Sequence, residues 1–246
     1  MPKVSIIIPA YNEEAFIGKL LQTILQVDIQ SVGFEREIIV VDNGSHDRTS
    51  EIVRQFPEVR LLRIEVNKGK GDGVRYGISQ ATGDCILIQD ADLEYDPQDY
   101  IPMLQRFQNT QGLVSIYGSR ILGEVKRNGN GLFFGKHKDK SVVTWLANLF
   151  LSFLAWGLFG RWITDTLTGY KIYPAKLLQK FTIQTTGFET DHELTVKLIR
   201  SGVKIVEVPI GYTPRTAEEG KKIQFTDFFI AVWTFLKFRF VSKNSF

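Results

Sequence analysis

Four acidic side chains follow a short apolar run in the segment CILIQDADLEYDP, residues 85–97: Asp90, Asp92, Glu94 and Asp96. Alternate residues of an extended chain point to the same side, so the first three could converge before the chain turns at Pro97. Carboxylates that close repel one another, which favours a cation between them. An Asp-Ala-Asp at a strand end suits a hard divalent cation such as Mn²⁺ or Mg²⁺, which would neutralise a bound diphosphate. Taken alone, the segment fits a solvated acidic turn equally well.

The elements that must position these acids alternate along residues 1–120. Strands are predicted at VSIIIPA, REIIVVD, VRLLRIEV, DCILIQDAD and LVSIYGSR, and helices at EEAFIGKLLQTILQ, TSEIVRQF and GKGDGVRYGISQAT. Repeated βα units with continuous apolar strands predict an α/β fold, with a mostly parallel central sheet flanked by helices on both faces. Ligands of such sheets bind beyond the carboxyl ends of the strands. That rule gathers the segments that follow the strands into one crevice: residues 9–13, 42–47, 67–71, 90–96 and 118–120.

Composition narrows the class of protein. The 246 residues fit one catalytic domain, placed at residues 1–222, followed by a tail at residues 223–246. The single cysteine, Cys85, excludes an intrachain disulfide, and the three histidines lack the spacing of a zinc site. The formal net charge is +3, and basic residues concentrate in residues 123–140 and 220–246, which adjoin very apolar sequence. No nucleic-acid partner is expected.

Further motifs accompany the acids at wide, regular intervals: PAYNEE, VVDNGSHDRT, NKGKGDGVRYGI and YGSR. Together they resemble the family 2 glycosyltransferases with the GT-A fold, a nucleotide-sugar-binding fold, over nearly the entire chain. The segments DTLTGYKIYP, GFETDHELTVKLIRSGVKIVEVPIGYTPR and EEGKKI resemble more closely the polyprenol-phosphate sugar synthases of the dolichyl-phosphate mannosyltransferase and glucosyltransferase type. This resemblance implies a metal-dependent enzyme that moves a hexose, with inversion, from a GDP- or UDP-sugar donor to a polyprenyl-phosphate acceptor, dolichyl or undecaprenyl phosphate.

The resemblance also implies which residues hold the donor. Four of them would border the nucleoside: Pro9, Tyr11, Glu13 and Asp42. Without the resemblance, the same residues fit turns at the ends of strands, with no role in binding. The family more often has a second acid after Asp42, where this chain has Asn43. Lys70, between two glycines, would approach the diphosphate, since glycine lets backbone amides come close and lysine adds charge. The alternative for this segment is a glycine-rich helix start.

For the metal, the resemblance implies that Asp90 lies near the ribose or the cation. Asp92 would be the main ligand of Mn²⁺ or Mg²⁺, and Glu94 a further one. The residues assigned a catalytic role are Asp92, Asp165 and Arg120. Asp165 precedes TLTGYK, where the family often has an acid that faces the acceptor, and an N-cap is its structural alternative.

The acceptor decides what the remaining residues must do. A lipid phosphate is already ionised at neutral pH, so it needs cations rather than a base. The candidates are Arg120, Lys126, Arg127 and Arg215, with phosphate contact favoured for Arg120 and Arg215 and a surface salt bridge for the other two. A saccharide hydroxyl would need a base to remove its proton, and Asp165 would then serve. Transfer to a saccharide hydroxyl in cell-envelope polysaccharide synthesis is the alternative function. A nucleotidyltransferase would want a glycine-rich loop after the first strand, and PAYNEE is not one. A non-catalytic nucleotide-binding or membrane-scaffold protein is disfavoured by the intact acids Asp90 and Asp92.

Two apolar segments raise the question of a membrane. Residues 142–160 hold nineteen residues without a charge, enough as one helix for ~30 Å of hydrocarbon. The predicted site resumes immediately afterwards, and Thr144, Asn148 and Ser152 recur every four residues, so one or two amphipathic helices within about 141–163 are expected to lie in the interface. The tail mixes aromatic and basic residues, which suits a membrane surface, with a core-packing final helix as the alternative. We therefore predict a peripheral or monotopic enzyme at the cytoplasmic face of a membrane.

Overall fold

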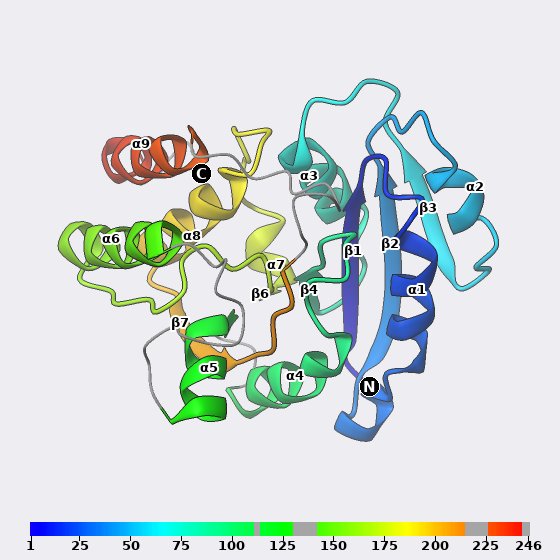
Figure 1. Cartoon of the computed structure of the whole chain (residues 1–246), viewed down its shortest axis with the longest axis horizontal. Coiled ribbons are helices and arrows are strands. Elements are labelled where there is room, and N and C mark those ends of the chain that lie inside the picture. Colours follow the sequence, from blue (N-terminus) through cyan, green and yellow to red (C-terminus); the bar gives the residue numbers. More distant parts are fainter. Residues whose placement is uncertain (111–113, 130–141, 215–225, 243–246) are drawn as a thin grey trace.

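The computed structural model of the chain describes residues 1–110, 114–129, 142–214 and 226–242 (Figure 1). Arg215, the segment EEGKKI at 218–223 and residues 130–140 of the first basic segment lie outside the described residues.

The described residues form one seven-stranded sheet. In Figure 1 its strands run from right to left in the order β3-β2-β1-β4-β6-β5-β7. Six strands are parallel to one another, and only β6 runs antiparallel, between β4 and β5. The sequence prediction of a mostly parallel sheet is confirmed. The strands are β1 (Lys3–Ala10), β2 (Glu35–Asp42), β3 (Val59–Arg63), β4 (Cys85–Ile88), β5 (Val114–Ser119), β6 (Lys171–Pro174) and β7 (Lys204–Pro209).

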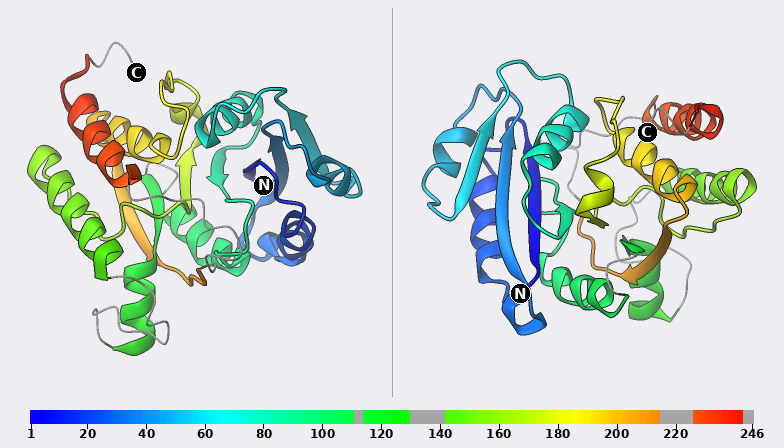
Figure 2. Two further views of the ribbon diagram at one scale, coloured as in Figure 1. Left: turned by 45° about the horizontal axis from the view of Figure 1, so that its top comes forward. Right: turned by 180° about the vertical axis from the view of Figure 1, so that it is seen from behind.

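Helices cover both faces of the sheet because successive strand residues are apolar on both sides. Ile6 and Ile8 of β1 pack in one hydrophobic cluster and Ile7 in another. The first cluster contains α1 (Ile17–Gln26), α2 (Thr49–Val53) and α4 (Tyr100–Asn109). The second contains α3 (Lys70–Gln80), α7 (Ala175–Leu178) and α8 (Thr190–Arg200). The two layers of helices are visible on either side of the sheet in Figure 2.

Three further helices lie toward the β7 end of the sheet. Helix α5 (Arg120–Asn128) continues directly from β5, whereas α6 (Val142–Phe159) and α9 (Thr226–Phe240) lie outside the sheet layers (Figure 1). A third hydrophobic cluster joins α6, α8 and α9 through buried side chains: Leu151, Ala155, Val196, Ala231, Phe235 and Phe238. The tail helix therefore has one face in the core.

The sequence predicts one more polar face on α6, formed by Thr144, Asn148 and Ser152, and two of these three side chains, Asn148 and Ser152, are buried. The opposite side exposes large apolar side chains, so the polar stripe faces the protein and the apolar one faces outward. Within the described ranges, none of the helices has the combination of length and apolar character that crossing a membrane requires.

Candidate active site

The carboxyl ends of six strands meet at one edge of the sheet, and the turns after β1 and β2 are tied together there. Asp42, the last residue of β2, is fully buried. One of its carboxylate oxygens accepts a hydrogen bond from the N–H of Ser45 at 2.8 Å, and the other accepts one from the Ser50 hydroxyl. The N–H of Glu13 donates to the Thr49 hydroxyl at 2.9 Å. These bonds fix the two turns relative to each other.

The residues predicted to border a nucleoside all lie at this edge. Pro9 is buried in β1 opposite Val41, Tyr11 is half-buried just past the strand, and Glu13 is buried. Asp42 organises its own turn, since both of its oxygens accept bonds from the protein. Contact of these four residues with a nucleoside stays a prediction.

The glycine-rich segment before α3 is packed against two other parts of the chain. Gly69 has a φ of 110°, a conformation that L side chains rarely adopt, and a Cβ there would lie 2.5 Å from the carbonyl oxygen of Thr186. The side-chain amide of Asn43 donates to the Gly69 carbonyl at 3.1 Å. Glycine is therefore required at position 69, and Lys70 begins α3 in a fixed place.

Lys70 lies between two carboxylates. Its Nζ is 2.7 Å from Oδ1 of Asp90 and 3.1 Å from Oδ2 of Asp191. Lys171, fully buried in β6, lies 3.8 Å from Oδ1 of Asp191. We call these four residues the lysine–aspartate cluster. Burial opposes charge on Lys70, but Asp191 and Asp90 outweigh it and raise the pKa of the lysine.

The two other members of the cluster respond to the same forces. Burial lowers the pKa of Lys171, and the nearby Lys70 lowers it further, against the attraction of Asp191. Burial alone would raise the pKa of Asp191, yet Lys70 and Lys171 hold it below its usual value. Lysine and aspartate thus stabilise each other's charged forms at the end of β4.

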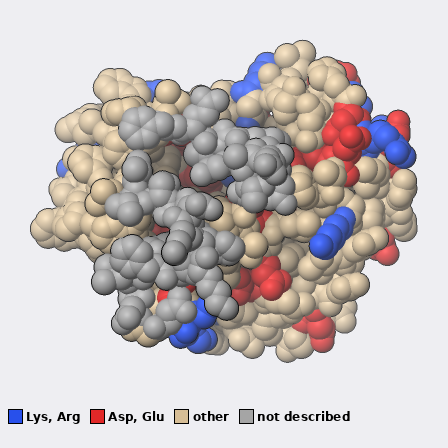
Figure 3. Space-filling model, in the orientation of Figure 1, with Lys and Arg blue, Asp and Glu red and all other residues tan. Residues whose placement is uncertain are grey.

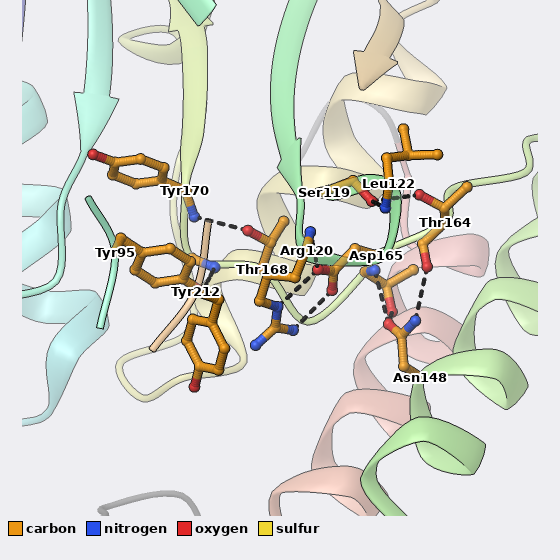
Figure 4. A network of polar contacts seen from close by, with 12 residues as sticks. Tyr95, Ser119, Arg120, Leu122, Asn148, Thr164, Asp165, Thr168, Tyr170 and Tyr212 are labelled. Carbon is orange, nitrogen blue, oxygen red and sulfur yellow. Dashed lines mark hydrogen bonds and ion pairs between the residues drawn. The ribbon is translucent and has the colours of Figure 1, made fainter. Parts of the chain in front are cut away.

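Arg120 and Asp165 form an ion pair where β5 ends and α5 begins (Figure 4). The guanidinium donates through Nε at 2.7 Å and through Nη2 at 2.8 Å, and the backbone N–H of Arg120 donates to the same carboxylate at 3.0 Å. The Asp165 side chain is 1% exposed and that of Arg120 is 17% exposed. Although burial acts in the other direction, Asp165 raises the pKa of Arg120. The third guanidinium nitrogen, Nη1, has no hydrogen-bond partner among the described residues.

Three tyrosines lie between this ion pair and the acids after β4. Tyr95 stacks on Tyr170 with ring centroids 4.8 Å apart, and its ring centroid lies 5.3 Å from that of Tyr212. The Tyr212 ring in turn lies 4.8 Å from the Arg120 guanidinium carbon. Burial raises the pKa of Tyr95 to about 12, and the charges of Arg120 and Asp90 both act on it. Tyr95 therefore lies near both the Arg120–Asp165 pair and Asp90.

Most of the chain matches a known protein family. Residues 5–179 match the model of the family described as glycosyl transferase family 2. The chain belongs to glycosyltransferase family 2. The resemblance predicted from the motifs is confirmed, and so is the α/β fold.

Relatives of this family 2 glycosyltransferase include a dolichol-phosphate mannosyltransferase of Pyrococcus furiosus. It is 29% identical over 225 residues, which cover 89% of this chain and 59% of that protein. A dolichyl-phosphate beta-glucosyltransferase of Trichomonas vaginalis is 28% identical over 221 residues, which cover 84% of this chain and 64% of the relative. The chain thus spans less than two thirds of the length of either protein.

Solved structures share the fold of this family 2 glycosyltransferase. A glucosyl-3-phosphoglycerate synthase from Mycobacterium tuberculosis, in complex with Mn²⁺, uridine diphosphate and phosphoglyceric acid, superimposes with a TM-score of 0.69 at 18% identity. The match covers 98% of this chain and 80% of that one. At this identity the likeness concerns the fold alone.

The predicted metal ligands of the family 2 glycosyltransferase are only partly brought together. In the described part of the chain, no three His, Cys, Asp or Glu side chains come close enough to hold a metal ion. Glu94 accepts a hydrogen bond from the Tyr212 hydroxyl at 2.9 Å, and Asp92 accepts one from the N–H of Glu94. Asp90 and Asp92 follow one strand end and stay candidate oxygen ligands; the Asp90 side chain is 25% exposed and pairs with Lys70. Mg²⁺ typically takes one or two carboxylates together with substrate phosphates, so this donor set fits such a cation.

Sequence reasoning missed three residues that organise the site. Lys171 and Asp191 belong to the lysine–aspartate cluster. Glu207 of β7 accepts the N–H of Thr164 at 2.9 Å and the N–H of Asp165 at 3.1 Å, and burial raises its pKa. A lysine or glutamate inside an apolar strand needs a polar partner, so Lys171 and Glu207 could have been recognised from the sequence as residues with buried partners.

Proposed function

We propose that this chain transfers a hexose from a GDP- or UDP-sugar to a polyprenyl phosphate at a membrane surface. The observation that carries the proposal is the buried pairing of Asp165 with Arg120. A base for a saccharide hydroxyl would need a carboxylate directed at the acceptor, whereas the Asp165 carboxylate accepts three hydrogen bonds from Arg120. Asp165 is thereby suited to holding a guanidinium in place, and a held guanidinium suits a phosphate acceptor.

In the proposed reaction, Arg120 and Lys70 supply positive charge to the two phosphate-bearing substrates. An oxygen of the lipid phosphate attacks the anomeric carbon, the bond from that carbon to the diphosphate breaks, and the configuration inverts. Arg120 would present Nη1 to the acceptor phosphate, and Lys70 would contact the diphosphate of the donor. No proton has to be removed from the nucleophile, so the step requires no general base.

Asp90 and Asp92 would hold the divalent cation. When bound, Mn²⁺ or Mg²⁺ would neutralise negative charge on the departing nucleoside diphosphate. Glu94 would join this shell through lone pairs that its bond with Tyr212 does not occupy. The Mn²⁺ complex of the Mycobacterium fold relative supports a divalent cofactor here.

An exposed apolar surface supports the membrane part of the proposal. It consists of side chains of α6 and α9 that are each at least half exposed, and we call it the aromatic face: Leu146, Phe150, Phe153, Trp156, Phe229, Trp233 and Phe240. The two helices pack together, with the rings of Phe150 and Phe228 5.7 Å apart. Figure 3 shows that this side of the molecule carries few charged side chains. Exposed aromatic rings at such density suit the headgroup region of a bilayer.

A transfer assay with the purified full chain tests the proposal. The protein receives labelled GDP-mannose or UDP-glucose, Mn²⁺, and polyprenyl phosphate in vesicles. The expected product is a glycosylated lipid phosphate, formed with one donor in preference to the other. A parallel reaction supplies a soluble oligosaccharide in place of the lipid. Transfer to the oligosaccharide without transfer to the lipid phosphate would overturn the proposal in favour of a saccharide-hydroxyl acceptor.

A further inference from the structure

Asn148 is the polar residue that joins the outer helix α6 to the loop that carries Asp165. Its side chain is buried, and its amide nitrogen donates to the carbonyl oxygen of Thr164 at 2.8 Å. Its amide oxygen accepts from the N–H of Thr166 at 3.0 Å and from the Thr166 hydroxyl at 3.1 Å. Only this orientation of the amide places a donor against the carbonyl and an acceptor against the N–H. The three bonds are drawn around Asn148 in Figure 4.

The same loop is held on its other side by the sheet. Glu207 of β7 accepts from the N–H and the hydroxyl of Thr164, at 2.9 and 2.7 Å, and the Thr164 hydroxyl also contacts the hydroxyl of Ser119 at the end of β5 at 2.7 Å. Residues 164–166 are therefore held by two strands and by one helix. Helix α6 leads directly into this loop and also contacts it through the rings of Phe153 and Trp162, and Asn148 adds the hydrogen bonds from α6 to residues 164 and 166.

Asp165 lies between the two residues that Asn148 holds, and its carboxylate fixes Arg120. A displacement of the loop would carry this carboxylate with it and move the guanidinium. On its opposite side α6 presents Phe150, Phe153 and Trp156 of the aromatic face, so one helix contacts both the loop and the surroundings of the protein.

We propose that Asn148 is a positioning residue for the transfer reaction. It couples the position of α6 to the geometry of the Arg120–Asp165 pair. Contact of the aromatic face with lipid, which acts on α6, would thereby reach this pair. The inference rests on the proposed function, because it concerns how the acceptor phosphate is received. A lipid acceptor that enters along α6 then meets an arginine whose position depends on that helix. Lys70 and Asp90 of the donor side lie on α3 and after β4, and Asn148 makes no hydrogen bond to either of these described segments.

Ser152 provides a matched control. It is buried on the same side of α6, one turn later, and its hydroxyl donates to the carbonyl of Asn148 within the helix at 2.9 Å. Ser152→Ala removes a buried polar contact from α6 without removing a bond to the loop. Asn148→Ala removes all three bonds to the loop, whereas Asn148→Asp keeps the two acceptor bonds and sets an oxygen against the Thr164 carbonyl.

The experiment measures the KM for polyprenyl phosphate in vesicles, the KM for the nucleotide sugar, and amide hydrogen exchange of the peptide that contains Arg120. The backbone N–H of Arg120 donates to Asp165, so its exchange reports on the pair without any acceptor. In Asn148→Ala we expect exchange to rise and the acceptor KM to rise about tenfold or more, since small misplacements at a reacting centre can cost up to about a hundredfold. The donor KM should stay within about twofold of wild type, and Ser152→Ala should match wild type in all three measurements.

The remaining outcomes separate this inference from the proposed function. Wild-type protein that does not glycosylate polyprenyl phosphate refutes the proposed function and the acceptor role of Asn148 with it. If wild type transfers sugar, an unchanged acceptor KM in Asn148→Ala overturns the inference alone. An equal loss in Ser152→Ala, or an equal rise in the donor KM, also overturns it because either result describes general damage to the fold. If Asn148→Ala does not fold, Asn148→Asp decides the question by the same criteria, with an expected effect in the same direction.

Discussion

Breaking the Arg120–Asp165 pair from either side should give the same defect. Asp165→Asn keeps the shape of the side chain but removes its charge and turns an amide donor toward the guanidinium. Arg120→Ala removes the guanidinium itself. If Asp165 acts only by holding Arg120, the double variant should be no worse than Arg120→Ala alone. If Asp165 instead acts as a general base, Asp165→Asn should reduce transfer both in wild type and in the Arg120→Ala variant.

The structure sets the size of the effect. The pair contains two side-chain hydrogen bonds between charged groups, at 2.7 and 2.8 Å, and such bonds contribute about 1.5–3 kcal/mol each. Removing one partner of a buried ion pair costs about 3–5 kcal/mol of stability. We expect a coupling energy of about 3 kcal/mol in transfer, which corresponds to a loss of about a hundredfold in each single variant.

The assay is steady-state transfer to polyprenyl phosphate for wild type, both single variants and the double variant, with calorimetric nucleotide binding as a control for the donor side. Arg127→Ala is the matched control, because Arg127 is 54% exposed on the same helix and pairs with Glu124 at 2.9 Å. Arg127 is exposed although its partner Glu124 is buried, and its guanidinium bonds to Glu124 rather than to the Arg120–Asp165 pair, so this variant should transfer normally. Additive losses in the double variant, or loss of nucleotide binding in Arg120→Ala, would refute the reasoning.

Further predictions concern metal binding, membrane binding and the pH dependence of stability. Asp92→Asn should abolish transfer and weaken metal-dependent nucleotide binding, because the amide lacks the charge that a divalent cation needs; full activity with a chelator present would contradict this. Replacing Trp156 and Trp233 with serine should weaken sedimentation with anionic vesicles about tenfold or more, since both indoles are over half exposed, whereas Tyr76→Ser on α3 should not. Burial raises the pKa of Asp99 to about 6, so the folded state holds this proton more tightly than the unfolded state. Relative to an Asp99→Asn variant, the wild-type melting temperature should therefore fall as pH rises from about 4 to about 6, and identical slopes for the two proteins would count against this assignment.

The sequence predicted the placement of the site well wherever a rule of sheet topology applied. The residues after β1, β2, β4 and β5 gather at one edge because parallel strands end on the same side. The closeness of Lys70 and Asp90 follows from this rule, since one begins the helix and the other ends the strand at that edge. No comparable rule covers β6, whose antiparallel direction brings the segment before Lys171 to the same edge.

Pairings across long stretches of chain could not be predicted. Arg120 and Asp165 were each expected to act on the acceptor, but periodicity gives no register between segments 45 residues apart that would show them as partners. The polar stripe of α6 predicts an amphipathic helix but does not show what its polar face contacts. Asn148 is buried because the loop at 164–166 offers it three hydrogen bonds, and that loop comes from beyond the helix. Hydrophobic patterning shows that two faces differ, and only tertiary contacts show which one is buried.

The lysine–aspartate cluster explains how one lysine can serve the site both with and without a donor. An ionised side chain buried without a partner costs several kcal/mol, and here Lys70 has Asp90 at 2.7 Å and Asp191 at 3.1 Å. Asp90 lies beyond a strand end, where we expect it to exchange its lysine for another cation when the donor binds. Asp191 lies on α8 and also pairs with the buried Lys171. Under the proposed function, Lys70 would keep this acidic partner after Asp90 changes its own, and its charge would stay available to the diphosphate. A site built with Asp90 alone would leave the lysine unpaired at the moment when the donor arrives.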